Sequence, residues 1–202
     1  MLQEFLLLAT AHLFAVATPG GDFAVVLKNT LRSGRKIGVL TAIGVGCGIA
    51  VHVVYTLFGV AIILSQSETL FNIVKITGAC YLLWMAWGAF GSRAQKAGTP
   101  KFEILQLKNV QAMRQGFITN VFNPKVTIFF LVLFTSIVSP QTPLVIQGFY
   151  GLWLVIYTMI WFMLVAWIFS RPQVLHWYQS HGHYFDWAMG AFLVFIAIQL
   201  LL

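Results

Sequence analysis

Long apolar segments dominate the pattern of hydrophobic and polar positions along the chain. They cover about residues 3–27, 37–64, 70–90, 117–139, 144–169 and 185–202, and shorter polar connections separate them. A helix needs about 20 consecutive apolar residues to cross a bilayer. The pattern therefore predicts six transmembrane helices. We expect one transmembrane domain over residues 1–202, with no soluble domain beside it.

The composition supports a membrane protein. The chain has 202 residues, of which 59% are hydrophobic and 8% are charged, whereas a soluble domain carries roughly a quarter charged residues. The first residues lack the positive region of a secretory signal and carry Glu4 instead, so we interpret them as a retained first span. The net charge of +7 could indicate nucleic acid, but we expect the lipid bilayer as the partner, and no nucleic acid.

The basic residues alternate from one connection to the next. The amino terminus and the connections 65–69 and 139–143 have no Lys or Arg. The other connections hold Lys28, Arg32, Arg35 and Lys36 in 28–36, then Arg93, Lys96, Lys101, Lys108 and Arg114 in 91–116, and Arg171 in 170–184. Basic connections face the cytoplasm, so both termini are predicted to lie outside.

The stretch "ATPGGDF" interrupts the first span. Thr18 is a good N-cap and Pro19 suits the first position of a helix, so we expect the span to break near Thr18 and restart at Pro19. Gly20 and Gly21 would leave backbone N–H groups open to a small ligand at a positive helix end. Asp22 follows, and carboxylates within spans usually have a function. The alternative is a structural cap whose charge the helix dipole offsets.

A second break is predicted in "GFITNVFNPKVTIFF". Asn123 followed by Pro124 repeats the pattern of an N-cap residue and a proline. Lys125 then lies in the first helical turn, where a cation is unfavourable. Its side chain either extends to the interface or meets an anion, for which Asp22 and a substrate carboxylate are the candidates.

The two breaks lie at similar predicted depths. Asp22 is six residues before Lys28, and Lys125 is about nine residues beyond Gly116, which places them roughly 9 and 13 Å from the inner ends. Each half has three spans and opens with the broken one. This layout predicts two inverted three-helix repeats, about 1–90 and 116–202, with broken helices 1 and 4 that mark a binding site. A chance coincidence of layout is the alternative.

Other polar residues are less specific. Gly44 and Gly48 form a G-x-x-x-G pattern, which is typical of close helix packing. His52, with Tyr55 near it, and His12 either line a pathway or are only hydrogen-bonded to a neighbour. The cysteines, Cys47 and Cys80, lie in apolar stretches and form no C-x-x-C pattern, which argues against a disulfide framework or zinc site.

Several stretches resemble the LysE/RhtB family of amino-acid exporters. "TPGGDFAVVLKNTLRSGRKIGVLTAIGVGCGIAVH" resembles its amino-terminal signature, "GACYLLWMAWGAF" its third span and "GFITNVFNPK" its fourth. The family usually has P-G-P-D, so Gly21 departs from it. The resemblance implies an inner-membrane exporter of amino acids or their derivatives, driven by protons, with no cofactor and no enzyme activity. The family-like motif residues are Pro19, Gly20, Asp22, Asn123, Pro124 and Lys125.

The hypothesis we favour is proton antiport. Asp22 binds a substrate ammonium group or a proton, but not both at full strength, while Lys125 and the helix N–H groups bind the substrate carboxylate. The alternatives are a cation or metal exporter, which would need more ligands than Asp22, Cys47 and His52 supply, and a membrane thiol oxidoreductase using Cys47 and Cys80. The sequence ranks no particular amino acid and leaves a homo-oligomer open.

Overall fold

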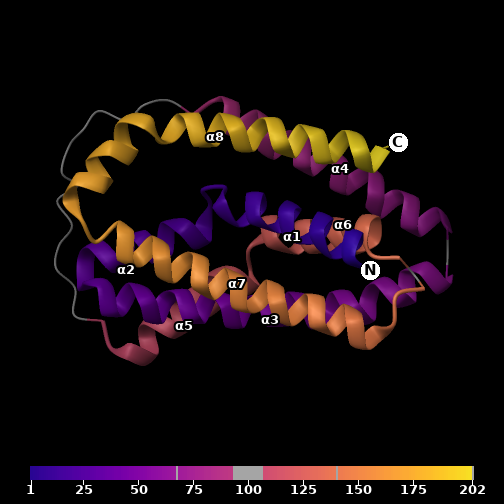
Figure 1. Ribbon diagram of the computed structural model, residues 1–202, viewed down its shortest axis with the longest axis horizontal. Coiled ribbons are helices and arrows are strands. Elements are labelled where there is room, and N and C mark those ends of the chain that lie inside the picture. The colour runs from indigo at the N-terminus through magenta and orange to yellow at the C-terminus, as the bar shows by residue number, and fades with distance from the viewer. Residues whose placement is uncertain (67, 93–106, 140, 202) are drawn as a thin grey trace.

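The computed structural model describes residues 1–66, 68–92, 107–139 and 141–201, and every regular element in these ranges is a helix. The elements in chain order are α1 (Leu2–Ala17), α2 (Gly21–Ser33), α3 (Arg35–Gln66), α4 (Glu68–Phe90), α5 (Asn109–Val121), α6 (Pro124–Ile137), α7 (Leu144–Ile168) and α8 (Pro172–Leu201). Figure 1 shows their arrangement. The predicted all-α fold class is confirmed.

Two pairs of successive helices are bent at the predicted breaks. The axes of α1 and α2 differ by 52°, and those of α5 and the apolar part of α6 by 56°. By length and composition, α3 over Arg35–Gly59 and α7 can each cross a membrane alone, and each bent pair can count as one further span. In α4 the apolar part is shorter, Ile76–Phe90. The described helices thus give two to four candidate spans.

Some predicted connections are helical. Residues 28–33 complete α2 and α3 begins at Arg35, so Gly34, with φ of 86°, is the link between them. Residues 172–184 belong to α8 instead of forming a loop. Hydropathy marks the apolar part of a helix, whereas a helix continues through polar residues as long as its backbone hydrogen bonds persist. Of the predicted connection 91–116, residues 93–106 lie outside the described residues.

The helices form layers around the two bent pairs. α4 and α8 lie side by side on one face, α3, α5 and α7 lie on the other, and α1 and α6 run between them (Figure 1). Glycines let α3 approach α5 closely, because a Cβ on Gly44 would lie 2.0 Å from the carbonyl oxygen of Met113 and one on Gly116 2.1 Å from that of Thr41. Close packing at the G-x-x-x-G pattern is therefore confirmed.

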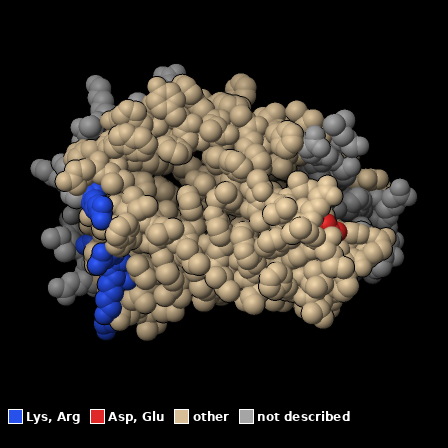
Figure 2. Space-filling view, viewed as in Figure 1, with Lys and Arg blue, Asp and Glu red and all other residues tan. Residues whose placement is uncertain are grey.

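Charge is separated along the long axis of the molecule. On the face drawn in Figure 2, the visible Lys and Arg side chains gather at one end, where α2 meets α3 and α7 meets α8, and acidic atoms lie toward the other end. Both termini lie at the end remote from the basic residues (Figure 1). The helix topology thus brings together, at one end of this face, described basic residues from different connections.

Candidate functional site

The first break differs in detail from the sequence prediction. α1 ends at Ala17, and the hydroxyl of Thr18 donates to the carbonyl of Phe14 at 2.9 Å. α2 begins at Gly21, with Gly20 as its extended N-cap residue. The predictions that Thr18 caps the second half-helix and that this helix restarts at Pro19 are wrong. Threonine hydroxyls readily bond the carbonyl four residues back, so Thr18 closes α1 and Pro19 belongs to the link.

The second break follows the prediction. Asn123 is the N-cap of α6, its side-chain oxygen accepts the backbone N–H of Lys125 at 3.1 Å, and Pro124 occupies the first helical turn. Proline has no N–H to lose there, and its fixed φ suits a helix start. This geometry places the backbone of Lys125 at the positive end of α6.

Asp22 joins the two breaks. Its side chain is 8% exposed, and Oδ2 accepts hydrogen bonds from the side-chain amides of Asn120 at 3.0 Å and Asn123 at 3.2 Å. Oδ1 is buried and has no hydrogen-bond partner in the described part of the chain. The carboxylate therefore has one oxygen fixed by two donors and one oxygen free to accept a further donor.

Asn120 was missed by the sequence analysis. It lies in the last turn of α5 and is fully buried. An amide within an apolar stretch, three residues before the predicted cap Asn123, was a signal that could have identified it. Residues three apart can lie on the same side of a helix, and here both amides reach Asp22.

Lys125 has a partner that the sequence analysis did not consider. Its ammonium nitrogen donates to the backbone carbonyl of Thr18 at 2.8 Å and lies more than 4.0 Å from the carboxylate oxygens of Asp22. The side chain is half-buried and lies against the other broken helix. Because Thr18 ends α1, its carbonyl is at the negative end of that helix dipole. The cation at the start of α6 is thus stabilised by the end of α1.

The two glycines of the first break line the space beside these charges. A Cβ on Gly20 would lie 3.5 Å from the ammonium nitrogen of Lys125, and one on Gly21 3.6 Å from a methyl carbon of Thr119. The first N–H groups of a helix have no partner within it. The amino end of α2 therefore presents donors next to Lys125.

A cavity of about 40 Å³ connects the residues of both breaks. Apolar side chains from α1, α2, α3, α6 and α7 complete its wall, and its polar lining consists of His12, Thr18, Asp22, Asn123, Lys125 and Thr158. A water molecule needs about 10–15 Å³ by this measure, so the cavity has room for a few waters. A substrate as large as an amino acid requires it to widen.

The histidines occupy different positions relative to this cavity. His12 lines it. His52 does not, but it lies behind Asn120, with Nε2 3.0 Å from the Asn120 carbonyl oxygen and Nδ1 2.7 Å from the hydroxyl of Tyr55. The structure therefore brings His52 to the residue that holds Asp22, not to the cavity itself.

On the basic side of the cavity, a buried network joins three helices. The side-chain amide of Asn29 in α2 donates to Thr41 of α3 and to Gln115 of α5, both at 3.0 Å. With the close approach of α3 to α5, this network closes the bundle on that side.

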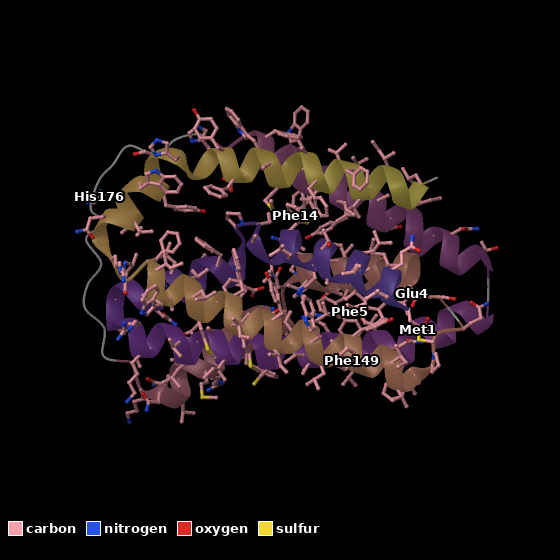
Figure 3. All side chains as sticks on the ribbon, in the orientation of Figure 1. Met1, Glu4, Phe5, Phe14, Phe149 and His176 are labelled. Atoms are coloured by element: carbon pink, nitrogen blue, oxygen red, sulfur yellow. The ribbon has the colours of Figure 1, made fainter. Side chains whose placement is uncertain are left out.

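On the side of the termini, Glu4 joins α1 to α7 and to the connection before it (Figure 3). Its carboxylate accepts from the Ser139 N–H at 3.0 Å, from the Thr142 hydroxyl at 3.0 and 3.1 Å, and from the Tyr150 hydroxyl at 3.3 Å. The cavity thus lies between two polar clusters, one toward each end of the molecule.

Among the described residues, no three side chains of His, Cys, Asp and Glu gather in a way that could hold a metal ion. Cys47 in α3 and Cys80 in α4 are free cysteines with exposed side chains.

Several known proteins are similar to this chain in sequence. A family model described as LysE type translocator matches residues 13–202. The chain is 30% identical over 207 residues to a threonine efflux protein of Escherichia coli K12, covering 100% of this chain and 99% of that protein. It is 31% identical over 199 residues to the uncharacterized membrane protein YahN of the same organism, and the match covers 95% of this chain and 87% of that protein. It is 28% identical over 207 residues to a threonine efflux protein of Salmonella typhi, and the match covers 100% of this chain and 99% of that protein. No solved structure matches. The chain belongs to the LysE-type translocator family of membrane proteins.

Proposed function

We propose that this protein exports an amino acid or a close derivative across the inner membrane by proton antiport. Membership of a translocator family and the names of the threonine efflux relatives support an amino-acid substrate. The observation that carries the proposal is the state of Asp22, a carboxylate buried at the junction of two broken helices with one unpaired oxygen.

Asp22 is the residue at which proton and substrate compete. Asn120 and Asn123 hold Oδ2 and fix the orientation of the carboxylate, which leaves Oδ1 for a proton or for an ammonium group. A carboxylate that binds a proton no longer attracts an ammonium group strongly. Release of the proton on the inner side therefore permits substrate binding there, and proton binding on the outer side favours substrate release.

Lys125 and the start of α2 bind the carboxylate of the substrate. The ammonium of Lys125 has three donors, of which one is used by the Thr18 carbonyl. The remaining donors, with the N–H groups of Gly20 and Gly21 at the positive end of α2, form a site for an anion. A zwitterion would then meet donors on one side and the Asp22 carboxylate on the other.

The architecture of the proposed transporter is six spans in two inverted repeats, about 1–90 and 116–202. In it, the pair α1–α2 corresponds to α5–α6, α3 to α7 and α4 to α8. The similar bends of 52° and 56° support the correspondence. The gathering of basic residues at the end remote from both termini supports an orientation with the termini in the periplasm.

The small volume of the cavity implies that transport needs two alternating openings. Breaking the Asn29 network between α2, α3 and α5 would open the cytoplasmic side. Breaking the Glu4 cluster would open the periplasmic side. Inverted repeats provide such motions by moving one half against the other around a fixed site.

Transport into inside-out vesicles tests the proposal. A growth-protection screen with toxic amino acids and analogues first identifies substrates, and labelled substrate is then offered to vesicles whose interior is acidified by respiration. We expect accumulation in vesicles with the protein, abolished by a protonophore and absent from vesicles without it. Accumulation of metal ions instead, or loss of activity in Cys47→Ser with Cys80→Ser, would contradict the proposal.

A further inference from the structure

A second polar pair lies in the wall of the same cavity. His12 of α1 and Thr158 of α7 both line it, and His12 Nε2 is 3.2 Å from the Thr158 hydroxyl. His12 is 2% exposed and Thr158 is fully buried. The other ring nitrogen of His12, Nδ1, has no hydrogen-bond partner among the described residues.

The surroundings of His12 are aromatic. The rings of Phe129, Phe130, Trp153 and Tyr157 have their centroids 5.8–6.4 Å from that of His12. Buried polar atoms are nearly always hydrogen-bonded, so an unpaired nitrogen beside a cavity indicates a group that a ligand completes.

The distance from His12 to the break suits an amino acid. His12 and Thr18 are separated by six residues of α1 and its cap, a rise of about 9 Å. Asp22 and Lys125 would hold the charged groups of an α-amino acid at the break, and its side chain would extend a few bonds toward His12. One hydrogen bond to the protein at the charged groups and one at the end of the side chain would cover the rest of the roughly 9 Å.

We propose that His12 and Thr158 form the side-chain subsite of the transporter and select small amino acids whose side chain carries a hydroxyl or a similar hydrogen-bonding group. The inference rests on the proposed function, since it assumes that the charged groups of the substrate bind at the helix breaks. The phenyl rings of Phe129 and Phe130, which also line the cavity, form the apolar remainder of this subsite.

Binding of matched amino-acid pairs tests this subsite. The full-length protein is purified into lipid nanodiscs, and its affinity for L-threonine and L-valine, which have nearly the same shape, is measured by thermal stabilisation. L-Serine and L-alanine form a second pair. A net hydrogen bond contributes on the order of 1 kcal/mol, so we expect the wild type to bind the hydroxylated member about fivefold more tightly.

The variants separate recognition from folding. In His12→Leu and in Thr158→Val, the preference for threonine over valine should fall to about onefold to twofold while valine binding persists. His12→Gln retains a donor and an acceptor and should keep part of the preference. Thr10→Val is the matched control, because Thr10 is on the same helix but its exposed hydroxyl donates to the Leu6 carbonyl at 2.7 Å.

The outcomes distinguish this inference from the proposed function. A wild type that binds valine as tightly as threonine, or a His12→Leu variant with an unchanged preference, would overturn the subsite and leave amino-acid export intact. A wild type that binds none of the four amino acids, in protein shown to be folded by its thermal transition, would overturn the subsite, whereas vesicle transport of the amino acids found in the growth-protection screen decides the proposed function.

Discussion

The ammonium group of Lys125 and the carbonyl of Thr18 form a 2.8 Å hydrogen bond between two broken helices. Lys125 begins α6, and Thr18 ends α1. The contact therefore places a cation from the start of one half-helix on the negative end of another. It also satisfies a carbonyl that the break in α1 would leave unpaired within an apolar bundle.

Asp22 makes the reciprocal contact. It lies in the first turn of α2 and accepts hydrogen bonds from Asn120 and Asn123, at the end of α5 and the cap of α6. Each broken span thus sends a charged side chain from its second half to the junction of the other span. Any motion that opens the cavity between the breaks must change at least one of these contacts.

Replacing Lys125 should impair transport more than folding. Lys125→Ala removes a charged hydrogen bond, which contributes about 1.5–3 kcal/mol, and the proposed anion site. We expect vesicle transport to fall at least about tenfold, since 1.4 kcal/mol corresponds to a factor of ten, while protein remains in the membrane. Lys125→Arg keeps the charge and should retain part of the activity. Lys108→Ala, at an exposed lysine, is the control. Normal transport by Lys125→Ala would contradict the proposal that this lysine binds the substrate carboxylate.

Gly48 should be required for the position of Asn120. A Cβ at this residue would lie 2.5 Å from the side-chain oxygen and 2.8 Å from the Cβ of Asn120, so alanine must displace the amide that holds Asp22. Overpacking of this kind typically costs 1–3 kcal/mol. We expect Gly48→Ala to lower both thermal stability and transport.

Gly59→Ala is the matched control for Gly48→Ala. Gly59 is on the same helix, and a Cβ there meets no atom within 4 Å. Alanine favours helix over glycine by about 1 kcal/mol, so this variant should be as stable as the wild type or slightly more stable, with unchanged transport. If Gly48→Ala left thermal stability and transport as unchanged as Gly59→Ala does, Asn120 would tolerate displacement.

The sequence predicted where the spans break, because proline next to small or capping residues has strong local rules. Asn123 followed by Pro124 forms the predicted cap. Thr18 does not cap α2, since its hydroxyl had a competing carbonyl four residues back. The Thr18 hydroxyl could either bond this carbonyl or cap the start of α2. The local pattern could not decide between these two hydrogen bonds, because the choice depends on how Pro19 and Gly20 turn the chain.

The contacts between helices that hold Lys125, Asn120 and His12 could not be predicted from the sequence, for a different reason. The Thr18 carbonyl that binds Lys125 is a backbone group, and every residue has one. Asn120 and His12 are polar residues with apolar neighbours in the sequence, and their orientation depends on how the helices pack. The sequence could indicate that such residues need partners, but the partners come from α2 and α7, about 100 or more residues away.

Both termini should lie on the periplasmic side of the inner membrane. The described Lys and Arg side chains that are visible in Figure 2 gather at one end of the molecule, and basic segments are retained in the cytoplasm. A phosphatase fused to the carboxyl terminus should be active, and one inserted in the 91–116 connection inactive. A fluorescent protein at the same two sites should give the opposite pattern. A cytoplasmic carboxyl terminus would also contradict the inverted repeats.

Asp22 should couple transport to protons. In Asp22→Asn, the side-chain oxygen can still accept from Asn120 and Asn123, but the residue no longer binds and releases a proton. We expect inside-out vesicles with this variant to lose proton-driven accumulation completely. Exchange of labelled for unlabelled substrate should survive at a reduced rate, because Lys125 and the start of α2 still bind the substrate carboxylate.

Asp22→Glu separates the charge of this residue from its geometry. Glutamate keeps a titrating carboxylate, but its extra methylene must fit in a cavity of about 40 Å³. Proton-driven accumulation should therefore be slower than in the wild type and still sensitive to a protonophore. The decisive measurement is accumulation of substrate against its gradient by Asp22→Asn. If that variant accumulates substrate as the wild type does, the carboxylate has no part in coupling, and its bonds to Asn120 and Asn123 serve only to join the two broken helices.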